Sequence, residues 1–134
     1  MSNERILVTE DDASILRLVT AILRRAGYEV DTVTNGRDAL ERIERTPYDV
    51  LVLDLMMPGS SGFDVLARLQ VTDPHHKFVI IMSAASIDIV AKAVNSNVFA
   101  VLRKPFEIDE LTAAVRGCIA LPPFVHTTPE KRAA

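Results

Sequence analysis

The sequence predicts an α/β domain in which five parallel strands alternate with five helices. Short apolar runs rich in Val, Ile and Leu, typical of strands covered on both faces, alternate with segments whose apolar residues recur every three or four positions. The 134 residues are 49% hydrophobic and 25% charged, a composition typical of one globular domain with its own core. We therefore expect a single domain built on an open parallel sheet.

Five segments have the pattern of strands. One of them, over residues 28–33, alternates apolar with acidic residues, which suits a half-exposed strand near a sheet edge. The other four are continuous apolar runs and are expected to lie at the buried centre of the sheet: 6–8, 50–53, 78–82 and 98–102.

Helices are expected between these strands. The first has apolar residues from Ile15 to Ala26 at helical spacing, is expected to begin at Asp12 or Ala13, and is expected to end at Gly27. The other four helices are predicted from apolar positions at Ala39, Leu40 and Ile43; at Phe63, Leu66 and Leu69; at Ile87, Val90, Ala91 and Val94; and at Ile108, Leu111, Thr112, Val115 and Ile119.

Residues 122–134 lose both periodicities and are expected to form a disordered tail or truncated linker after a domain of residues 1–121.

The composition and the patterns of the sequence argue against several classes of protein. A lone cysteine, Cys118, forms no internal disulfide, and no apolar run approaches the ~20 residues of a membrane helix. With no export signal, the expected location is the cytoplasm. The net charge of −3 argues against direct binding of nucleic acid.

Polar side chains follow four of the five predicted strands. Because the carboxyl ends of parallel strands meet at one edge of a sheet, we expect these side chains to converge on a site there. They are Glu10, Asp11 and Asp12 after the first run, Asp54 after the third, Ser83 after the fourth and Lys104 after the fifth.

This set of residues favours metal-assisted phosphoryl chemistry. Close carboxylates repel one another by about 4 kcal/mol per pair at an effective dielectric of about 20, and a divalent cation offsets that repulsion. Oxygen ligands without His or Cys favour Mg²⁺. Asp54 then retains an oxygen that can attack a phosphoryl group, while Lys104 and Ser83 surround the phosphoryl oxygens.

Four segments together resemble the receiver domains of two-component response regulators. They are residues 6–12, 50–59, 80–84 and 104–106, and the resemblance extends over residues 4–120. It implies a flavodoxin-like (βα)5 fold, doubly wound, with strand order 2-1-3-4-5. It also implies Mg²⁺-dependent phosphorylation of an aspartate by the phosphohistidine of a sensor histidine kinase or a histidine phosphotransfer protein. The domain would then change its contacts with a downstream protein target or output domain, and would not be an enzyme in its own right.

The resemblance also assigns roles to residues of the acidic site. Asp54 matches the phosphoacceptor, and Glu10 and Asp11 match the acidic pair that holds the metal with Asp54 and the backbone carbonyl of Met56.

Further positions match the phosphate-binding and switch elements of the family. Ser83, with Ala84 beside it, matches the switch hydroxyl, and Lys104 matches the phosphate-binding lysine, whose bond to Pro105 is expected to be cis. Ile15 and Leu18 on the first helix match positions that dock the kinase, or they mark the boundary of the core.

The sequence departs from the family at the switch. Val101 stands where the family usually has Tyr or Phe, and Asn97-Val98 replaces a common Gly-Ala pair. The adjacent Phe99 should point away from its immediate neighbours, so we do not expect it to substitute for the missing aromatic. The resemblance therefore implies an atypical output face.

Two alternatives to a phosphate-accepting receiver remain open at this stage. A pseudo-receiver would use the same fold as a phosphate-independent interaction module, and Val101 favours it. An aspartyl-phosphate hydrolase would need a general acid two residues after the nucleophile, where Met56 cannot donate a proton. In the family that the chain resembles, the positions of Met56 and Ala85 flank the path of an attacking water. Neither side chain can orient a water, so the resemblance implies a long-lived phosphoryl group.

Overall fold

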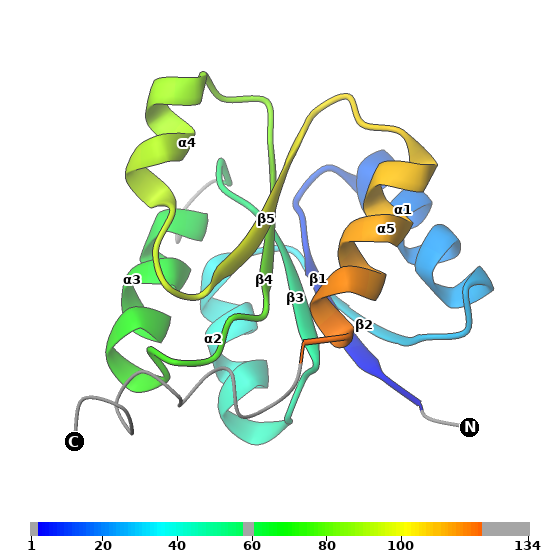
Figure 1. Ribbon diagram of the computed structural model, residues 1–134, viewed down its shortest axis with the longest axis horizontal. Coiled ribbons are helices and arrows are strands. Elements are labelled where there is room, and N and C mark those ends of the chain that lie inside the picture. Colours follow the sequence, from blue (N-terminus) through cyan, green and yellow to red (C-terminus); the bar gives the residue numbers. More distant parts are fainter. Residues whose placement is uncertain (1–2, 58–60, 122–134) are drawn as a thin grey trace.

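The computed structural model describes residues 3–57 and 61–121 (Figure 1), so the predicted tail or linker over 122–134 lies outside the described residues. The elements run β1 (Arg5–Thr9), α1 (Ala13–Arg25), β2 (Glu29–Val33), α2 (Gly36–Arg45), β3 (Val50–Asp54), α3 (Gly62–Thr72), β4 (Val79–Ser83), α4 (Ile87–Ala93), β5 (Val98–Arg103) and α5 (Ile108–Ile119). The predicted alternation of five strands and five helices is confirmed.

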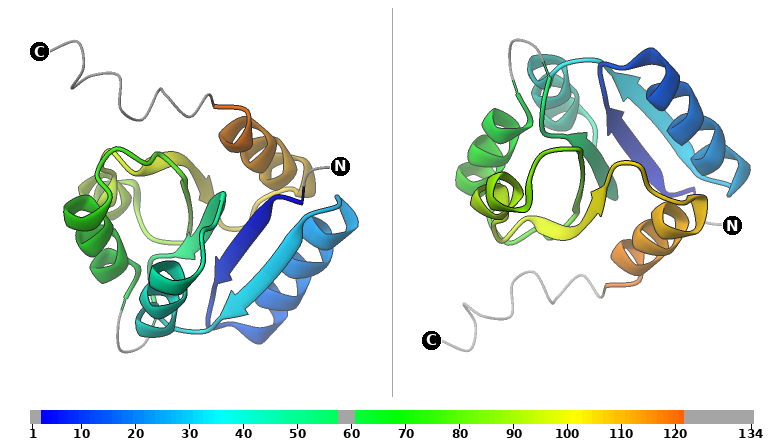
Figure 2. Two further views of the ribbon diagram at one scale, coloured as in Figure 1. Left: turned by 90° about the horizontal axis from the view of Figure 1, so that it is seen from below. Right: turned by 90° about the horizontal axis from the view of Figure 1, so that it is seen from above.

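All the strands pair in parallel, in the order β2-β1-β3-β4-β5. This confirms the doubly wound arrangement that the resemblance implied. Figure 2 shows α1 and α5 on one face of the sheet and α2, α3 and α4 on the other. Every residue of β3 and β4 is buried because helices cover both faces of these central strands. β2 lies at the sheet edge, as its alternating sequence predicted.

Local sequence signals set the helix boundaries. Asp12 precedes α1, and its side chain accepts hydrogen bonds from the N–H groups of Ser14 and Ile15. Two residues after the helix, Gly27 has a φ of +102°, a conformation that glycine adopts without a steric penalty. Ser61 caps α3 in a reciprocal pair with Asp64.

The prediction for α4 was right about the helix and only partly right about its apolar face. Ile87 is 72% exposed, and the helix ends at Ala93, so that Val94 is extended and 49% exposed. Val90 is buried as predicted, and Ala93 completes the buried face. Since α4 has only seven residues, it completes fewer turns than the apolar spacing suggested.

A register shift in β5 directs two neighbouring side chains to different helices. Val79 pairs with Val98 and Ile80 pairs with Ala100, which leaves Phe99 as an extra residue in the strand. The Phe99 ring packs against α5 at Gly117. Val101 instead lines a hollow of about 310 Å³ with residues of α4. Phe99 therefore does not occupy the place of Val101, as expected. The reason is the register shift, because regular alternation would have put these two residues on the same face.

Within the described ranges, 3–57 and 61–121, no helix combines the length and the apolar character needed to cross a membrane.

Candidate functional site

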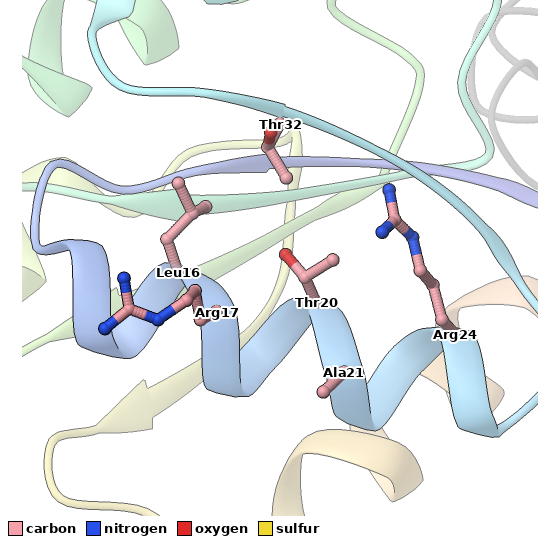
Figure 3. Close-up of a pocket in the computed structure, with 6 residues that line it drawn as sticks. All are labelled: Leu16, Arg17, Thr20, Ala21, Arg24 and Thr32. Atoms are coloured by element: carbon pink, nitrogen blue, oxygen red, sulfur yellow. The ribbon is translucent and has the colours of Figure 1, made fainter.

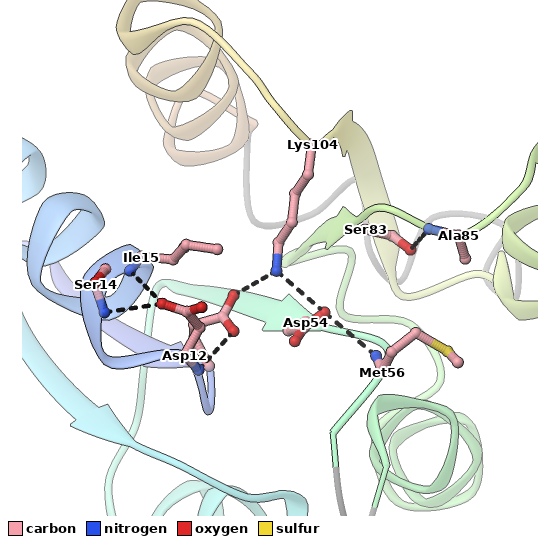
Figure 4. A network of polar contacts seen from close by, with 9 residues as sticks. Asp12, Ser14, Ile15, Asp54, Met56, Ser83, Ala85 and Lys104 are labelled. Carbon is pink, nitrogen blue, oxygen red and sulfur yellow. Dashed lines mark hydrogen bonds and ion pairs between the residues drawn. The ribbon is translucent and has the colours of Figure 1, made fainter.

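Three carboxylates and an ammonium group meet at the carboxyl edge of the sheet. Figure 4 labels Asp54 and Lys104 of this group. Carboxylate oxygens of Glu10, Asp11 and Asp54 lie within 4.8 Å of one another. Glu10 and Asp54 are 1% and 3% exposed, whereas Asp11 is exposed. The structure thus brings together the acidic residues that the sequence predicted, in a cluster that opens to solvent on the side of Asp11.

Lys104 reaches the cluster from the end of β5. Its Nζ lies 2.7 Å from Glu10 Oε1 and 3.5 Å from Asp54 Oδ1. Its backbone N–H donates to the Ser83 carbonyl at 2.8 Å, which ties the lysine to the end of β4. The bond between Lys104 and Pro105 is cis, as expected. In this state the ammonium group is paired more closely with Glu10 than with Asp54.

Asp12 contributes to the site through its backbone. Its carboxylate caps α1, so this side chain stands outside the cluster. Its N–H donates to Glu10 Oε2 at 3.0 Å. Glu10 is therefore held at both oxygens, by Asp12 N–H and by Lys104 Nζ. This contact was not predicted, because no pattern along the sequence shows which backbone N–H group meets the Glu10 carboxylate.

The environment of Asp54 disfavours its charged form. Burial, followed by the negative charge of Glu10, raises the pKa of Asp54 from 3.8 to about 6. The Lys104 ammonium and the Met56 N–H, which donates to Asp54 Oδ1 at 3.3 Å, act in the opposite direction. The cluster thus holds more negative charge than Lys104 compensates.

This raised pKa predicts a pH-dependent stability. The folded protein binds the Asp54 proton more tightly than the unfolded chain, so the free energy of unfolding decreases as pH rises from about 4 to about 6. The pKa difference corresponds to roughly 3 kcal/mol. The Asp54→Asn variant lacks this titrating group, so its free energy of unfolding should rise relative to that of the parent between pH 4 and pH 6. Denaturant unfolding of both proteins in the presence of a chelator measures the difference. A difference that stays constant from pH 4 to pH 7 would contradict the prediction.

The donor set of the cluster fits a hard divalent cation. Three carboxylates supply oxygen ligands, and no His or Cys belongs to this group among the described residues. Burial and the negative charge of Glu10 raise the pKa of Asp54, and a bound cation would offset that charge. Glu10, Asp11 and Asp54 are the residues that could hold Mg²⁺, with the Met56 carbonyl as the further ligand that the sequence suggested.

The remaining predicted site residues differ in how far their side chains are buried. Ser83 is fully buried at the end of β4, and its Oγ accepts a hydrogen bond from Ala85 N–H at 2.9 Å, while Ala84 is exposed. Ile15 is partly buried against the core, whereas Leu18 is 54% exposed on α1. Of the two proposed docking residues, Leu18 is thus the one with a largely accessible side chain.

Two structural residues escaped the sequence analysis, one beside the site and one at the opposite edge of the sheet. Gly62 begins α3 directly behind Asp54, and its N–H donates to the Leu55 carbonyl at 3.1 Å. Asn97 is buried, and its Nδ2 donates to the Asp73 and His76 carbonyls at 2.7 and 2.9 Å, which joins the loop before β4 to the turn before β5. The glycine just before the apolar pattern of α3 could have indicated a close backbone contact. No sequence pattern could have indicated the hydrogen bonds of Asn97.

A separate groove of about 460 Å³ lies between α1 and β2 (Figure 3). Its lining includes Arg17 and Arg24 but none of the acidic residues of the cluster. Arg24 Nη2 donates to the Val30 carbonyl at 3.0 Å, so this arginine has a structural role at the sheet edge. The chemistry of the molecule is therefore concentrated at the acidic cluster and not in this groove.

Residues 6–116 match the family model described as the response regulator receiver domain. Among curated proteins, the chain is 29% identical over 121 residues to Sporulation initiation phosphotransferase F of Bacillus subtilis, covering 90% of this chain and 98% of that protein. It is 34% identical over 131 residues to Transcriptional regulatory protein TcrA of Mycobacterium tuberculosis, covering 94% of this chain. The chain spans 52% of the length of that second relative.

Solved structures give the same result. A putative response regulator from Chloroflexus aurantiacus has a TM-score of 0.82 and 25% identity, with coverage of 90% of this chain and 100% of that chain. The response regulator protein TrrA of Thermotoga maritima, in complex with Mg(2+)-BeF, has a TM-score of 0.75 and 33% identity, with coverage of 86% and 98%.

Proposed function

Because this chain belongs to the response regulator receiver domain family, we propose that Asp54 accepts a phosphoryl group from the phosphohistidine of a histidine kinase or a histidine phosphotransfer protein. The observation that carries the proposal is the meeting of Glu10, Asp11, Asp54 and Lys104, from three separate strand ends, at one edge of the sheet. Phosphorylation is proposed to change the contacts of the domain with a downstream protein, without turnover of a substrate.

In the proposed reaction, a carboxylate oxygen of Asp54 attacks the phosphorus of the phosphohistidine. A P–O bond forms while the P–N bond breaks, and its electron pair passes to the imidazole nitrogen, which takes up a proton. Asp54 is suited to this role because it is fixed at the end of β3 and by the Met56 N–H. Its pKa of about 6 leaves mostly carboxylate at neutral pH.

The neighbouring residues would stabilise the charge of the transferred group. Lys104 Nζ is 3.5 Å from Asp54 Oδ1, near enough to contact a phosphoryl oxygen after transfer. Glu10 and Asp11 would hold Mg²⁺ next to Asp54, and a structural relative is a complex with Mg(2+)-BeF. When bound, the cation would neutralise negative charge on the phosphoryl oxygens. Ser83 lies at the end of the adjacent strand, and its side chain is proposed to be the switch hydroxyl that responds to the phosphoryl group.

The pairing of Lys104 with Glu10 suggests how phosphorylation could be sensed. A phosphoryl group on Asp54 adds charge and acceptor oxygens beside an ammonium that lies 2.7 Å from Glu10. Lys104 is expected to shift toward that group. Since Lys104 N–H is bonded to the Ser83 carbonyl, such a shift would reach the ends of both β4 and β5.

The proposal is tested by incubating the protein with acetyl phosphate and Mg²⁺ and measuring its intact mass. We expect a stable gain of one phosphoryl group that disappears when EDTA replaces Mg²⁺. No gain with Mg²⁺ present would favour the pseudo-receiver, and steady release of phosphate over many turnovers would favour a hydrolase.

One observation favours the pseudo-receiver as a second candidate. Val101 leaves a hollow of about 310 Å³ lined by Ile87, Val90 and Ala91, where the family usually has an aromatic side chain. A receiver without that aromatic could bind its partner in the same way whether or not Asp54 is phosphorylated. Comparing partner binding by the parent and by Asp54→Asn distinguishes this case.

The phosphoryl group on Asp54 is expected to persist after the donor is removed. Met56 and Ala85 match positions that flank the path of an attacking water in the family, and neither side chain offers a hydrogen bond to position that water. Desalting the phosphorylated protein and following its intact mass measures the half-life. Rapid loss of phosphate without a phosphatase would show that another group orients the water.

A further inference from the structure

The methionines that the structure describes differ greatly in exposure. Met56 is 56% exposed, whereas Met57 is 7% exposed and Met82 is fully buried. The rate at which a thioether reacts with peroxide depends on access to its sulfur. Met56 is therefore the most oxidisable methionine in residues 3–57 and 61–121.

Met56 is also fixed beside the acceptor carboxylate. Its N–H donates to Asp54 Oδ1 at 3.3 Å, and the intervening Leu55 is buried and bonded through its N–H to the Met82 carbonyl. The backbone at Met56 is thus anchored while its side chain remains accessible. Figure 4 shows the thioether directed away from the Asp54 carboxylate.

We propose that Met56 is an oxidation site through which hydrogen peroxide shortens the lifetime of the phosphoryl group on Asp54. The inference rests on the proposed function. The sulfur attacks one peroxide oxygen, so that an S–O bond forms and the O–O bond breaks. Sulfur loses two electrons and the peroxide is reduced. The departing hydroxide takes the proton of the S–OH group and leaves as water, and methionine sulfoxide remains.

Oxidation to the sulfoxide gives the Met56 side chain a strong hydrogen-bond acceptor that the thioether lacks. A thioether is a weak hydrogen-bond acceptor, whereas the sulfoxide is polar and its oxygen accepts hydrogen bonds from water. Met56 lies two residues after Asp54, on the open side of the site. The thioether points away from Asp54, but the side chain is 56% exposed and can rotate. In a rotamer turned toward Asp54, the sulfoxide would hold a water near the phosphorus, so that hydrolysis accelerates.

Cys118 does not compete effectively for the oxidant. Its side chain is 5% exposed, and burial raises the pKa of its thiol to about 12. The reactive thiolate is therefore scarce at neutral pH. Met56 also lies outside the core, so its oxidation introduces no polar group among packed apolar side chains.

The first test locates the modification. The folded protein is treated with limiting peroxide, digested and mapped by peptide mass. We expect one added oxygen at Met56 while Met57 and Met82 remain thioethers. Oxidation of Met57 or Met82 at the rate of Met56 would overturn the assignment of the site.

The second test measures the phosphoryl half-life of each protein with and without prior peroxide treatment. In the parent and in Met57→Leu, peroxide should shorten the half-life several-fold, and methionine sulfoxide reductase should restore it. In Met56→Leu, the two half-lives should be equal whatever their absolute value. Cys118→Ala should respond as the parent does, because the thiol takes no part.

The outcomes separate this inference from the proposed function. If the untreated protein takes up no phosphoryl group, the proposed function fails and the coupling fails with it. If uptake occurs and the half-life is the same after oxidation of Met56, only the coupling is wrong. Equal shortening in Met56→Leu would assign the effect to another residue and overturn the inference.

Discussion

Replacing Asp54 by Asn is expected to abolish the uptake of a phosphoryl group from acetyl phosphate. The amide has nearly the shape of the carboxylate but lacks its nucleophilic oxygen. The substitution also removes a negative charge that is 3% exposed and close to Glu10, so the variant should be at least as stable as the parent at neutral pH. Intact mass after incubation with Mg²⁺ and acetyl phosphate gives the result, and the loss of uptake cannot then be attributed to unfolding.

Asp12→Asn is the matched control for this variant. It removes a carboxylate from the same edge of the sheet, and Asn caps a helix about as well as Asp. The backbone N–H that bonds Glu10 is retained. This control should take up one phosphoryl group as the parent does. Uptake by Asp54→Asn would show instead that a different side chain is the acceptor, and peptide mapping would identify it.

Gly62→Ala is expected to produce the largest loss of stability, about 3 kcal/mol, toward the upper end of the usual cost of overpacking. A Cβ at this position would overlap the Asp54 carbonyl oxygen and lie 2.7 Å from the Leu55 Cα. Both are backbone atoms of a buried segment, which cannot rotate away as a side chain does. Denaturant unfolding monitored by circular dichroism measures the effect, and phosphoryl uptake should decrease too because Asp54 is displaced.

Gly117→Ala provides the comparison, since the same methyl group is added within another helix. There the added Cβ would lie 3.1 Å from Phe99 Cζ, an atom at the far end of a side chain that can adjust. Alanine also favours a helix over glycine by about 1 kcal/mol. The stability of this variant should stay within about 1 kcal/mol of the parent. Equal stabilities for the two variants would mean that α3 can move away from β3.

The alternation of periods in the sequence was sufficient to predict every strand and helix. Burial on both faces demands continuous apolar runs, and burial of one helix face demands apolar residues every three or four positions, so these patterns are visible along the chain. The order of strands came from the resemblance of four motifs. The acidic cluster was predictable because parallel strands end at one edge, which brings Glu10 and Asp54 together.

The pairing of individual side chains was decided by the tertiary structure alone. Sequence placed the start of the first helix at Asp12 or Ala13 without showing that the Asp12 N–H also bonds Glu10. It likewise placed Lys104 at the site but not 2.7 Å from Glu10. Such contacts depend on where distant backbone segments stop and how their side chains turn, and no periodicity along the chain records either quantity.

The same distinction explains β5 and α4. The extra residue in β5 separates Phe99, which packs on α5, from Val101, which faces α4, and strict alternation along the strand could not reveal this. Sequence by itself thus determined the architecture and the chemical groups gathered at its edge. Burial follows from the spacing of apolar residues, and the residues after each strand lie at the same edge because the strands are parallel. Which groups touch was left to packing between segments far apart in the chain.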